Sequence, residues 1–270
     1  METHPNSSAS RICNRTSAVK VFATLTFLAG VVCAGYSKLT AISNSAGSQE
    51  KHLVGIRIQA GPADRELTLM FSVSPATRVP PIVRWPGTAS RRAKKLEVLS
   101  DSAGPYSARV GDIQNVDNGQ VLVELSDAQN GLHELHSADF AVREIATNRP
   151  SSSPSRDGHF VVHTIPTGIS QGSRLLISSG ELPIDALPTG VSSGAVVGAY
   201  FLDSIPSLVK MEGWRLAIAT VPADGKMALF YLPKGGATWK PLETNLVEGH
   251  PLLDAAIAGP GTYLLVKGAK

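Results

Sequence analysis

The chain has 270 residues, of which 43% are hydrophobic, and its formal net charge is +3. Four of the 25 basic residues but only one of the 22 acidic residues lie in residues 1–44, so the remaining body is electrically balanced. This balance argues against a nucleic-acid partner, because phosphate binding needs a concentration of Lys and Arg. Both cysteines, Cys13 and Cys33, also precede the body, which therefore has neither a disulfide nor thiol chemistry.

A hydrophobic stretch near the N-terminus, residues 19–36, follows the basic residues Arg11 and Arg15. This arrangement predicts a signal sequence or a signal anchor, with residues 1–18 on the cytoplasmic side and residues 37–49 as a spacer. A spanning helix needs about 20 apolar residues and a signal-peptide core about 7 to 15, so the length leaves both open. We expect an extracytoplasmic body anchored to the cell membrane, or a secreted or periplasmic protein if the signal is cleaved.

Cys33 raises a third possibility, a lipoprotein signal, in which a peptidase cuts before a cysteine that then carries lipid. Such signals have a small residue immediately before the cysteine, whereas Val32 stands there in this chain. The lipoprotein is therefore the least favoured of the three interpretations.

Residues 50–147 read as an all-β domain, because short apolar runs alternate with turn residues. In one of these runs Val121, Val123 and Leu125 recur with a period of two, which places them on one face of a strand. The pattern predicts an antiparallel β-sandwich. Its expected strands are residues 52–59, 66–73, 81–85, 95–99, 106–110, 120–125 and 138–145.

Residues 148–156 are rich in Pro and Ser, which predicts an extended linker. A second β-sandwich is expected at 157–270, where apolar runs at 214–221, 227–232 and 262–266 are too short for helices. The predicted fold class is therefore all-β, with two antiparallel β-sandwich domains preceded by one N-terminal hydrophobic helix.

Both expected domains carry short motifs with a family likeness. The stretch from Val121 to Val142 resembles the last hairpin of bacterial immunoglobulin-like domains, with Phe140-x-Val142 in the closing strand. The Ile165-Pro166 motif and the closing Gly261-Thr262-Tyr263 are similar to modules of the ankyrin and netrin-receptor β-sandwich class. The resemblance to cell-surface and envelope modules of bacteria implies an interaction or structural role and names no chemistry.

One motif is typical of serine hydrolases. Gly190-Val191-Ser192-Ser193-Gly194 matches Gly-x-Ser-x-Gly, and Asp203 and His250 follow in the order of a catalytic triad. The motif counts only when a strand precedes the serine and a helix follows it. Leu187-Pro188-Thr189 precedes it here and a strand-like run follows, so we regard catalysis by Ser192 as the weaker hypothesis.

Two histidine pairs are candidate metal ligands. His133 and His136 are three residues apart, an offset that sends them to opposite faces of a strand. His159 and His163 could share a strand face, but no Cys or carboxylate lies nearby with ligand spacing. Neither pair predicts a zinc site.

Two further groups could serve a ligand surface. A basic run could meet an anionic lipid or polymer, although charged residues on an edge strand also prevent aggregation of sheets, which is the favoured interpretation. Three aromatic residues could bind a sugar, although packing in the core is favoured. The basic run is Arg91, Arg92, Lys94 and Lys95, and the aromatic residues are Trp85, Trp214 and Tyr231.

The sequence therefore predicts no catalytic, cofactor-binding or metal-binding residue. We expect a non-catalytic interaction or structural module of the cell envelope that meets the membrane through its N-terminal helix and an unidentified protein or glycan through its body. The alternative is a secreted or envelope hydrolase with Ser192 as nucleophile.

The predicted orientation is testable with a reporter that is active only outside the cytoplasm. Fused after residue 50, it should be active, because Arg11, Arg15 and Lys20 hold the preceding end in the cytoplasm. A silent fusion, together with activity of a cytoplasmic reporter at the same position, would refute export.

Overall fold

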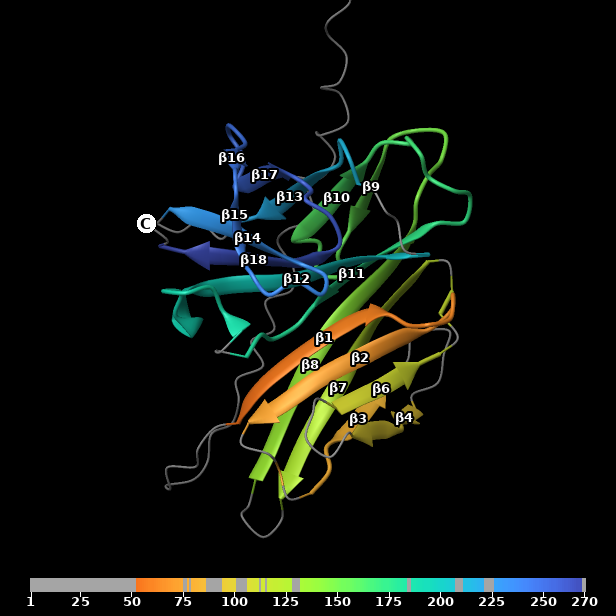
Figure 1. Ribbon diagram of the computed structural model, residues 1–270, viewed down its shortest axis with the longest axis vertical. Helices are drawn as coiled ribbons and strands as arrows, with labels where there is room; N and C mark the ends of the chain where they lie inside the picture. The colour runs from red at the N-terminus through yellow and green to blue at the C-terminus, as the bar shows by residue number, and fades with distance from the viewer. Residues whose placement is uncertain are drawn as a thin grey trace, which may run out of the picture. The chain divides into compact units, whose positions relative to one another are not determined.

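The computed structural model describes residues 52–268 except 75–76, 78, 86–93, 101–105, 112, 115, 128–131, 184–185, 207–210 and 221–225. These residues form antiparallel sheets, which confirms the all-β prediction (Figure 1). The expected N-terminal helix at 19–36 lies outside the described residues. Within the part that is described, no helix is long and apolar enough to cross a membrane.

The described strands form three sheets. A four-stranded sheet has the order β1-β2-β6-β5, a five-stranded sheet the order β16-β17-β13-β10-β9, and a nine-stranded sheet the order β15-β14-β18-β12-β11-β8-β7-β3-β4. The strands are β1 Leu53–Ala60, β2 Leu67–Ser74, β3 Ile82–Trp85, β4 Lys94–Leu96, β5 Val98–Ser100, β6 Tyr106–Val110, β7 Asp117–Asp127, β8 Leu132–Glu144, β9 Ser151–Pro154, β10 Phe160–Thr164, β11 Arg174–Ser179, β12 Val196–Ile205, β13 Arg215–Ala219, β14 Met227–Pro233, β15 Lys240–Leu242, β16 Asn245–Leu246, β17 Leu252–Ala256 and β18 Gly261–Lys267.

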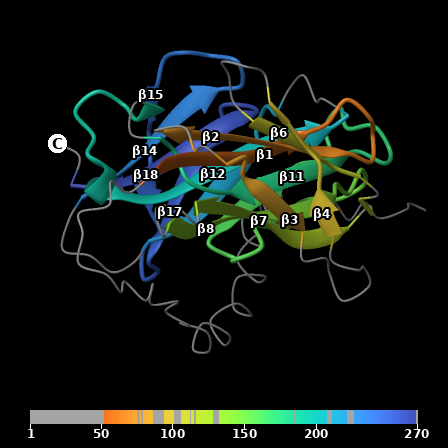
Figure 2. The ribbon, with the colours of Figure 1, turned by 90° about the horizontal axis from the view of Figure 1, so that it is seen from below.

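The two smaller sheets pack against the nine-stranded sheet through separate apolar cores. The four-stranded sheet shares one core with β3, β7 and β8, in which Val121, Val123 and Leu125 are fully buried as their alternation predicts. The five-stranded sheet shares a second core with β11, β12, β14 and β18. Figures 1 and 2 show β1 and β2 as a layer over β7 and β8.

The middle strand β11 is buried on both faces. Leu176 belongs to the first core, whereas Leu175 and Ile177 belong to the second. Side chains of successive strand residues point to opposite faces, so the two smaller sheets cover opposite faces of the nine-stranded sheet. A strand buried in this way reads as a continuous apolar run, as β11 does.

The nine-stranded sheet continues across the expected boundary between the domains. β8 of residues 50–147 pairs with β11 of residues 157–270 from Arg174↔Glu144 to Ser179↔Asp139. The division into two folding units, 50–147 and 157–270, stays a prediction.

The structure also differs from the expected linker at 148–156. Ser151–Pro154 form β9, which pairs with β10 in the five-stranded sheet. Serine hydroxyls of β9 are hydrogen-bonded to side chains of β10: Ser151 Oγ lies 2.7 Å from Thr164 Oγ1, and Ser152 Oγ lies 2.8 Å from Nδ1 of His163. Short side chains that favour a linker in isolation thus bond to a neighbouring strand.

The expected strand 95–99 is divided between two sheets at Glu97. β4 ends the nine-stranded sheet and β5 ends the four-stranded sheet. Lys94 and Lys95 therefore lie on an edge strand, as favoured for the basic run. Arg91 and Arg92 lie outside the described residues.

β1 is the edge strand of the four-stranded sheet, yet its free edge faces the nine-stranded sheet instead of water. Three backbone groups on this edge have hydrogen-bond partners in β11, in β12 or in the segment that follows β11. The amide of Ile56 donates to the carbonyl of Glu181 (2.8 Å), the carbonyl of Ile58 accepts from Ser178 Oγ (2.9 Å), and the amide of Ala60 donates to Asp203 Oδ2 (3.0 Å). Asp203 also accepts from Nζ of Lys234 (2.7 Å) and from the amide of Ser204 (2.9 Å).

Two glycines allow the close approach of β1 to the segment that follows β11. A Cβ at Gly180 would lie 2.1 Å from the carbonyl oxygen of Ile56, and a Cβ at Gly55 would lie 2.5 Å from Cδ of Pro183. Backbone atoms have little freedom to yield, so any side chain at Gly180 forces the two segments apart.

The substitution Gly180→Ala should lower the free energy of unfolding by about 2 to 3 kcal/mol, because it overpacks a backbone contact. A denaturant titration measures this change. The control is Gly111→Ala, whose added Cβ meets nothing within 4 Å and should leave the free energy of unfolding unchanged or slightly higher. Equal effects of the two substitutions would contradict the close-approach argument.

Candidate functional site

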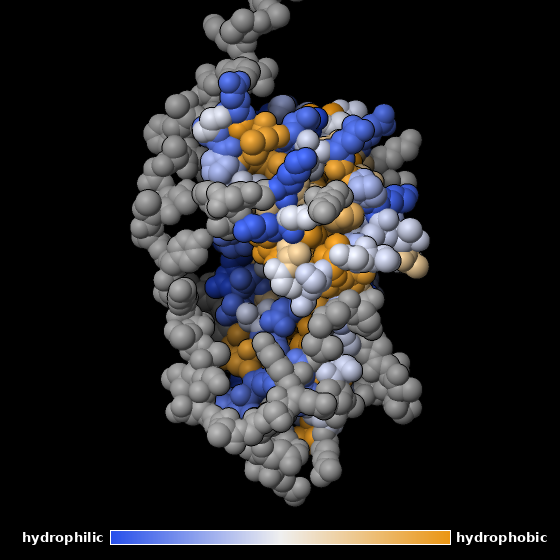
Figure 3. All heavy atoms as spheres, turned by 90° about the vertical axis from the view of Figure 1, so that its left-hand side faces the viewer, coloured by the Kyte–Doolittle hydropathy of each residue, from blue (hydrophilic) through white to orange (hydrophobic). Residues whose placement is uncertain are grey.

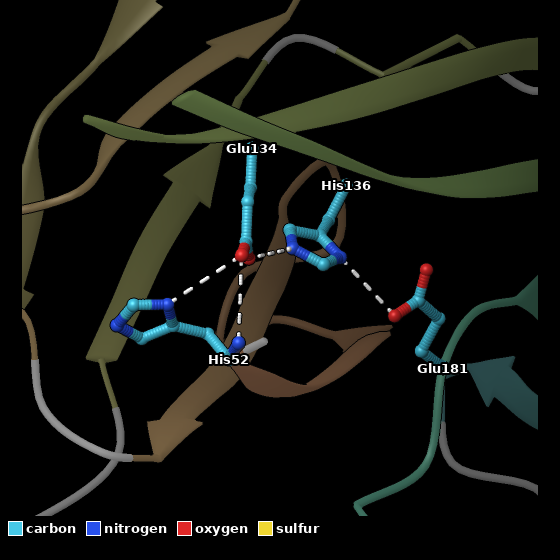
Figure 4. A network of polar contacts seen from close by, with 4 residues as sticks. All are labelled: His52, Glu134, His136 and Glu181. Carbon is cyan, nitrogen blue, oxygen red and sulfur yellow. Dashed lines mark hydrogen bonds and ion pairs between the residues drawn. The ribbon is translucent and has the colours of Figure 1, made fainter. Parts of the chain in front are cut away.

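Among the described residues, four ionisable side chains at the junction of β1, β8 and β11 form a carboxylate–histidine network. His52 immediately precedes β1, Glu134 and His136 lie on β8, and Glu181 follows β11 (Figure 4). Three segments far apart in sequence thus meet in one network.

The strand geometry of β8 brings Glu134 and His136 together. Residues two apart on a strand point to the same face, and this face continues through Ala138 and Phe140 into the first core. His133 is exposed on the other face, so the expected separation of His133 from His136 is confirmed.

Both ring nitrogens of His136 face a carboxylate. Nδ1 lies 3.2 Å from Oε2 of Glu181, and Nε2 lies 3.3 Å from Oε2 of Glu134. The second oxygen of Glu134 accepts a hydrogen bond from the amide of His52 (3.4 Å) and lies 3.6 Å from Nδ1 of the same residue. The His136 side chain is only 7% exposed, whereas that of Glu181 is 53% exposed.

The surroundings of His136 favour its charged form. The hydrogen bond to Glu181 raises the pKa of His136 above its ordinary value of 6.5, burial of the ring opposes this rise, and the charge of Glu181 and the contact with Glu134 add to it. Only the imidazolium can donate from both nitrogens at once. The geometry therefore suits a proton held between two carboxylates.

This arrangement ties segments together better than it transfers protons. A general base needs a free nitrogen within reach of a substrate, whereas both nitrogens of His136 are occupied inside the protein. Across the described ranges, no group of three or more His, Cys, Asp or Glu residues is placed to hold a metal ion. In Figure 4, the ring of His52 and the ring of His136 lie on different sides of the Glu134 carboxylate.

The residues of the hydrolase hypothesis have other surroundings. Ser192 is exposed and precedes a single 3₁₀ turn at Ser193–Ala195, and β11 ends well before it, at Ser179. Asp203 is nearly buried and bonds to Ala60 and Lys234. Exposed His250 follows a turn closed by its own amide. The strand and helix of a nucleophile elbow do not flank Ser192 in the described residues.

The second histidine pair is also separated. His163 lies on β10 and its Nδ1 is hydrogen-bonded to Ser152 of β9, whereas His159 lies in the turn before β10, 3.6 Å from Asp157. Burial lowers the pKa of His163, which favours its neutral form. The aromatic residues Trp85, Trp214 and Tyr231 are buried in the two cores, as favoured for packing.

Sequence reasoning missed three members of the network. It paired His136 with His133, although Glu134 is the neighbour that shares its strand face. His52 and Glu181 could not be found from spacing, because only the tertiary fold brings His52 to Glu134 and Glu181 to His136. The available signal was the Glu134-x-His136 pattern, but the strand expected there began only at residue 138, whereas β8 begins at Leu132.

No known protein family, curated protein or solved structure matches this chain. The family likenesses noted in the sequence remain expectations.

The raised pKa of His136 gives a signed pH dependence of stability. Its contribution, about 1 kcal/mol for hydrogen bonds of this kind, is fully present below pH 6.5 and is lost as pH rises through the higher folded-state pKa. Urea titrations of the wild type and of His136→Gln across this range should give a difference that shrinks with rising pH.

The control for this measurement is His133→Gln, which changes an exposed histidine on the same strand and should keep the wild-type pH dependence. The lowered pKa of His163 changes the free energy of unfolding with pH in the opposite direction. All three proteins contain His163, so this contribution cancels when their free energies of unfolding are subtracted. A difference that grows with pH would contradict the assignment.

Proposed function

We propose that this protein is a non-catalytic β-sandwich module of the cell envelope, exported or tethered by its N-terminal hydrophobic segment, that binds a protein or glycan through the surface of its body. Two sandwich domains, the first of them immunoglobulin-like, belong to this proposal. The all-β fold supports a module of this kind, and fold alone does not choose the partner.

The observation that carries the proposal is the outer face of the β7–β8 hairpin and its neighbours, which we call the hairpin face. Leu135 is 61% exposed there, in line with Glu124 and Ile82 of the adjoining strands. The other face of the same strands is the first core. The hairpin face consists of Ile82, Arg84, Lys95, Leu122, Glu124 and Leu135.

The charges of the hairpin face also favour an external partner. Arg84 and Lys95 lie directly opposite each other on β3 and β4, and both are exposed. Like charges in such a pair disfavour the sheet. Glu124 offsets the charge of Arg84, because its carboxylate accepts a hydrogen bond from Nε of Arg84 (3.0 Å). The positive charge of Lys95 is left on a face that also carries apolar side chains.

Pairing of a partner strand at a sheet edge is the less favoured mode of binding. The outer strands β4, β5, β9, β15 and β16 have only two to four residues each, and β9 and β15 contain proline. Short, charged or proline-containing edges resist added strands.

On the face shown in Figure 3, hydrophobic and hydrophilic residues are interspersed, which suits an interface that contains both kinds of residue.

Affinity capture from solubilised envelope tests the proposal with the full-length protein. The double variant Arg84→Ser, Leu135→Ser should capture at least about five-fold less of the specific partner, because loss of about 1 kcal/mol lowers affinity by this factor. The control is Leu246→Ser, which removes an exposed leucine from β16 of the five-stranded sheet. Equal capture by all three proteins would exclude the hairpin face as the binding surface. Separately, ester hydrolysis that disappears in Ser192→Ala would replace the module by the hydrolase.

A further inference from the structure

The segment Gly180–Pro183 is held in place by three contacts of different kinds. The carbonyl of Glu181 accepts from the amide of Ile56 at 2.8 Å. Gly180 and Pro183 lie against the backbone of β1 at Ile56 and Gly55. The third contact is the Glu181 side chain, which reaches His136 on β8. The first two contain no ionisable group, whereas the third depends on a proton.

We propose that His136 is a proton-operated latch that fastens Gly180–Pro183, and with it the adjoining part of β1, to β8. The protonated ring donates to Glu134 and Glu181 at the same time. The neutral ring has one donor, so one nitrogen lone pair then faces a carboxylate about 3.2 to 3.3 Å away.

Glu181 is the partner that leaves when the proton is lost. Glu134 lies on a strand and is also held by the amide of His52, and its side chain is 20% exposed. Glu181 lies on a connecting segment with 53% of its side chain exposed, so water replaces its contact at little cost. Loss of the proton therefore loosens Gly180–Pro183 and leaves Glu134 in place.

Among the described residues, three ionisable groups lie within hydrogen-bonding or ion-pairing distance of His136 or of its partner Glu134. Glu134 comes from the strand of His136 itself, Glu181 from the segment after β11, and His52 from the residue before β1. The two carboxylates favour the closed, protonated latch. The latch is therefore closed in mild acid and open in mild base.

The amide of Ile56 reports directly on the latch, because its acceptor is the carbonyl of Glu181. Hydrogen exchange of the full-length protein in a mild detergent is compared at about pH 6 and about pH 8, after correction for the intrinsic effect of pH on exchange. Corrected exchange of Ile56 and of the amides at 180–182 should rise several-fold at the higher pH, while amides of the five-stranded sheet should not change.

Matched variants separate the latch from a general effect of pH. Glu181→Gln, at a half-exposed position that tolerates change, and His136→Gln should both abolish the rise, whereas His133→Gln should keep it. Equal corrected exchange of the wild type at both pH values would overturn the proposal. A rise that persists in Glu181→Gln, or that disappears in His52→Gln but not in His136→Gln, would also overturn it.

Discussion

The structure of the body depends on how the free edge of β1 is satisfied. An edge strand presents a row of backbone N–H and C=O groups, and burying them without partners costs free energy comparable to lost hydrogen bonds. β1 crosses the face of a second sheet, so strand pairing is excluded on that side. The serine and carboxylate side chains of Ser178 and Asp203 supply the missing partners, with the carbonyl of Glu181. This role explains why the polar residues Ser178 and Asp203 are buried in the nine-stranded sheet.

The same constraint places the carboxylate–histidine network. Ser178 and Glu181 flank Gly180, whose missing side chain lets the chain lie against β1. Glu181 then projects toward β8, where the alternation of the strand presents His136 on the inner face. Glu181 thus supplies both a backbone acceptor for β1 and the carboxylate that contacts His136. A change in one of these contacts therefore alters the other. Asp203, which resembled a catalytic acid in sequence order, serves the backbone of β1 instead.

Local patterns predicted the local structure well, and non-local pairing escaped them. The period of two at Val121 to Leu125 identified a half-buried strand because it reflects one strand and one core. Ser151–Pro154 read as a linker because their bonding partners are on β10, which composition does not reveal. The sheet shared by β8 and β11, the contact of His52 with Glu134 and the contact of Glu181 with His136 all join segments far apart in sequence. These features follow from topology, which short motifs do not encode.

The long span of these contacts has a consequence for the order in which the chain is made. Ala60 and Asp203 are separated by 143 residues, and Ile58 and Ser178 by 120. After β1 has been synthesised, the ribosome must add most of the body before Ser178 and Asp203, the partners of that strand, are present. Until then the free edge of the first strand lacks these partners, although β3, β7 and β8 can already cover its apolar face. The hydrogen bonds that close the free edge of β1 therefore form only after Asp203 has been added to the chain.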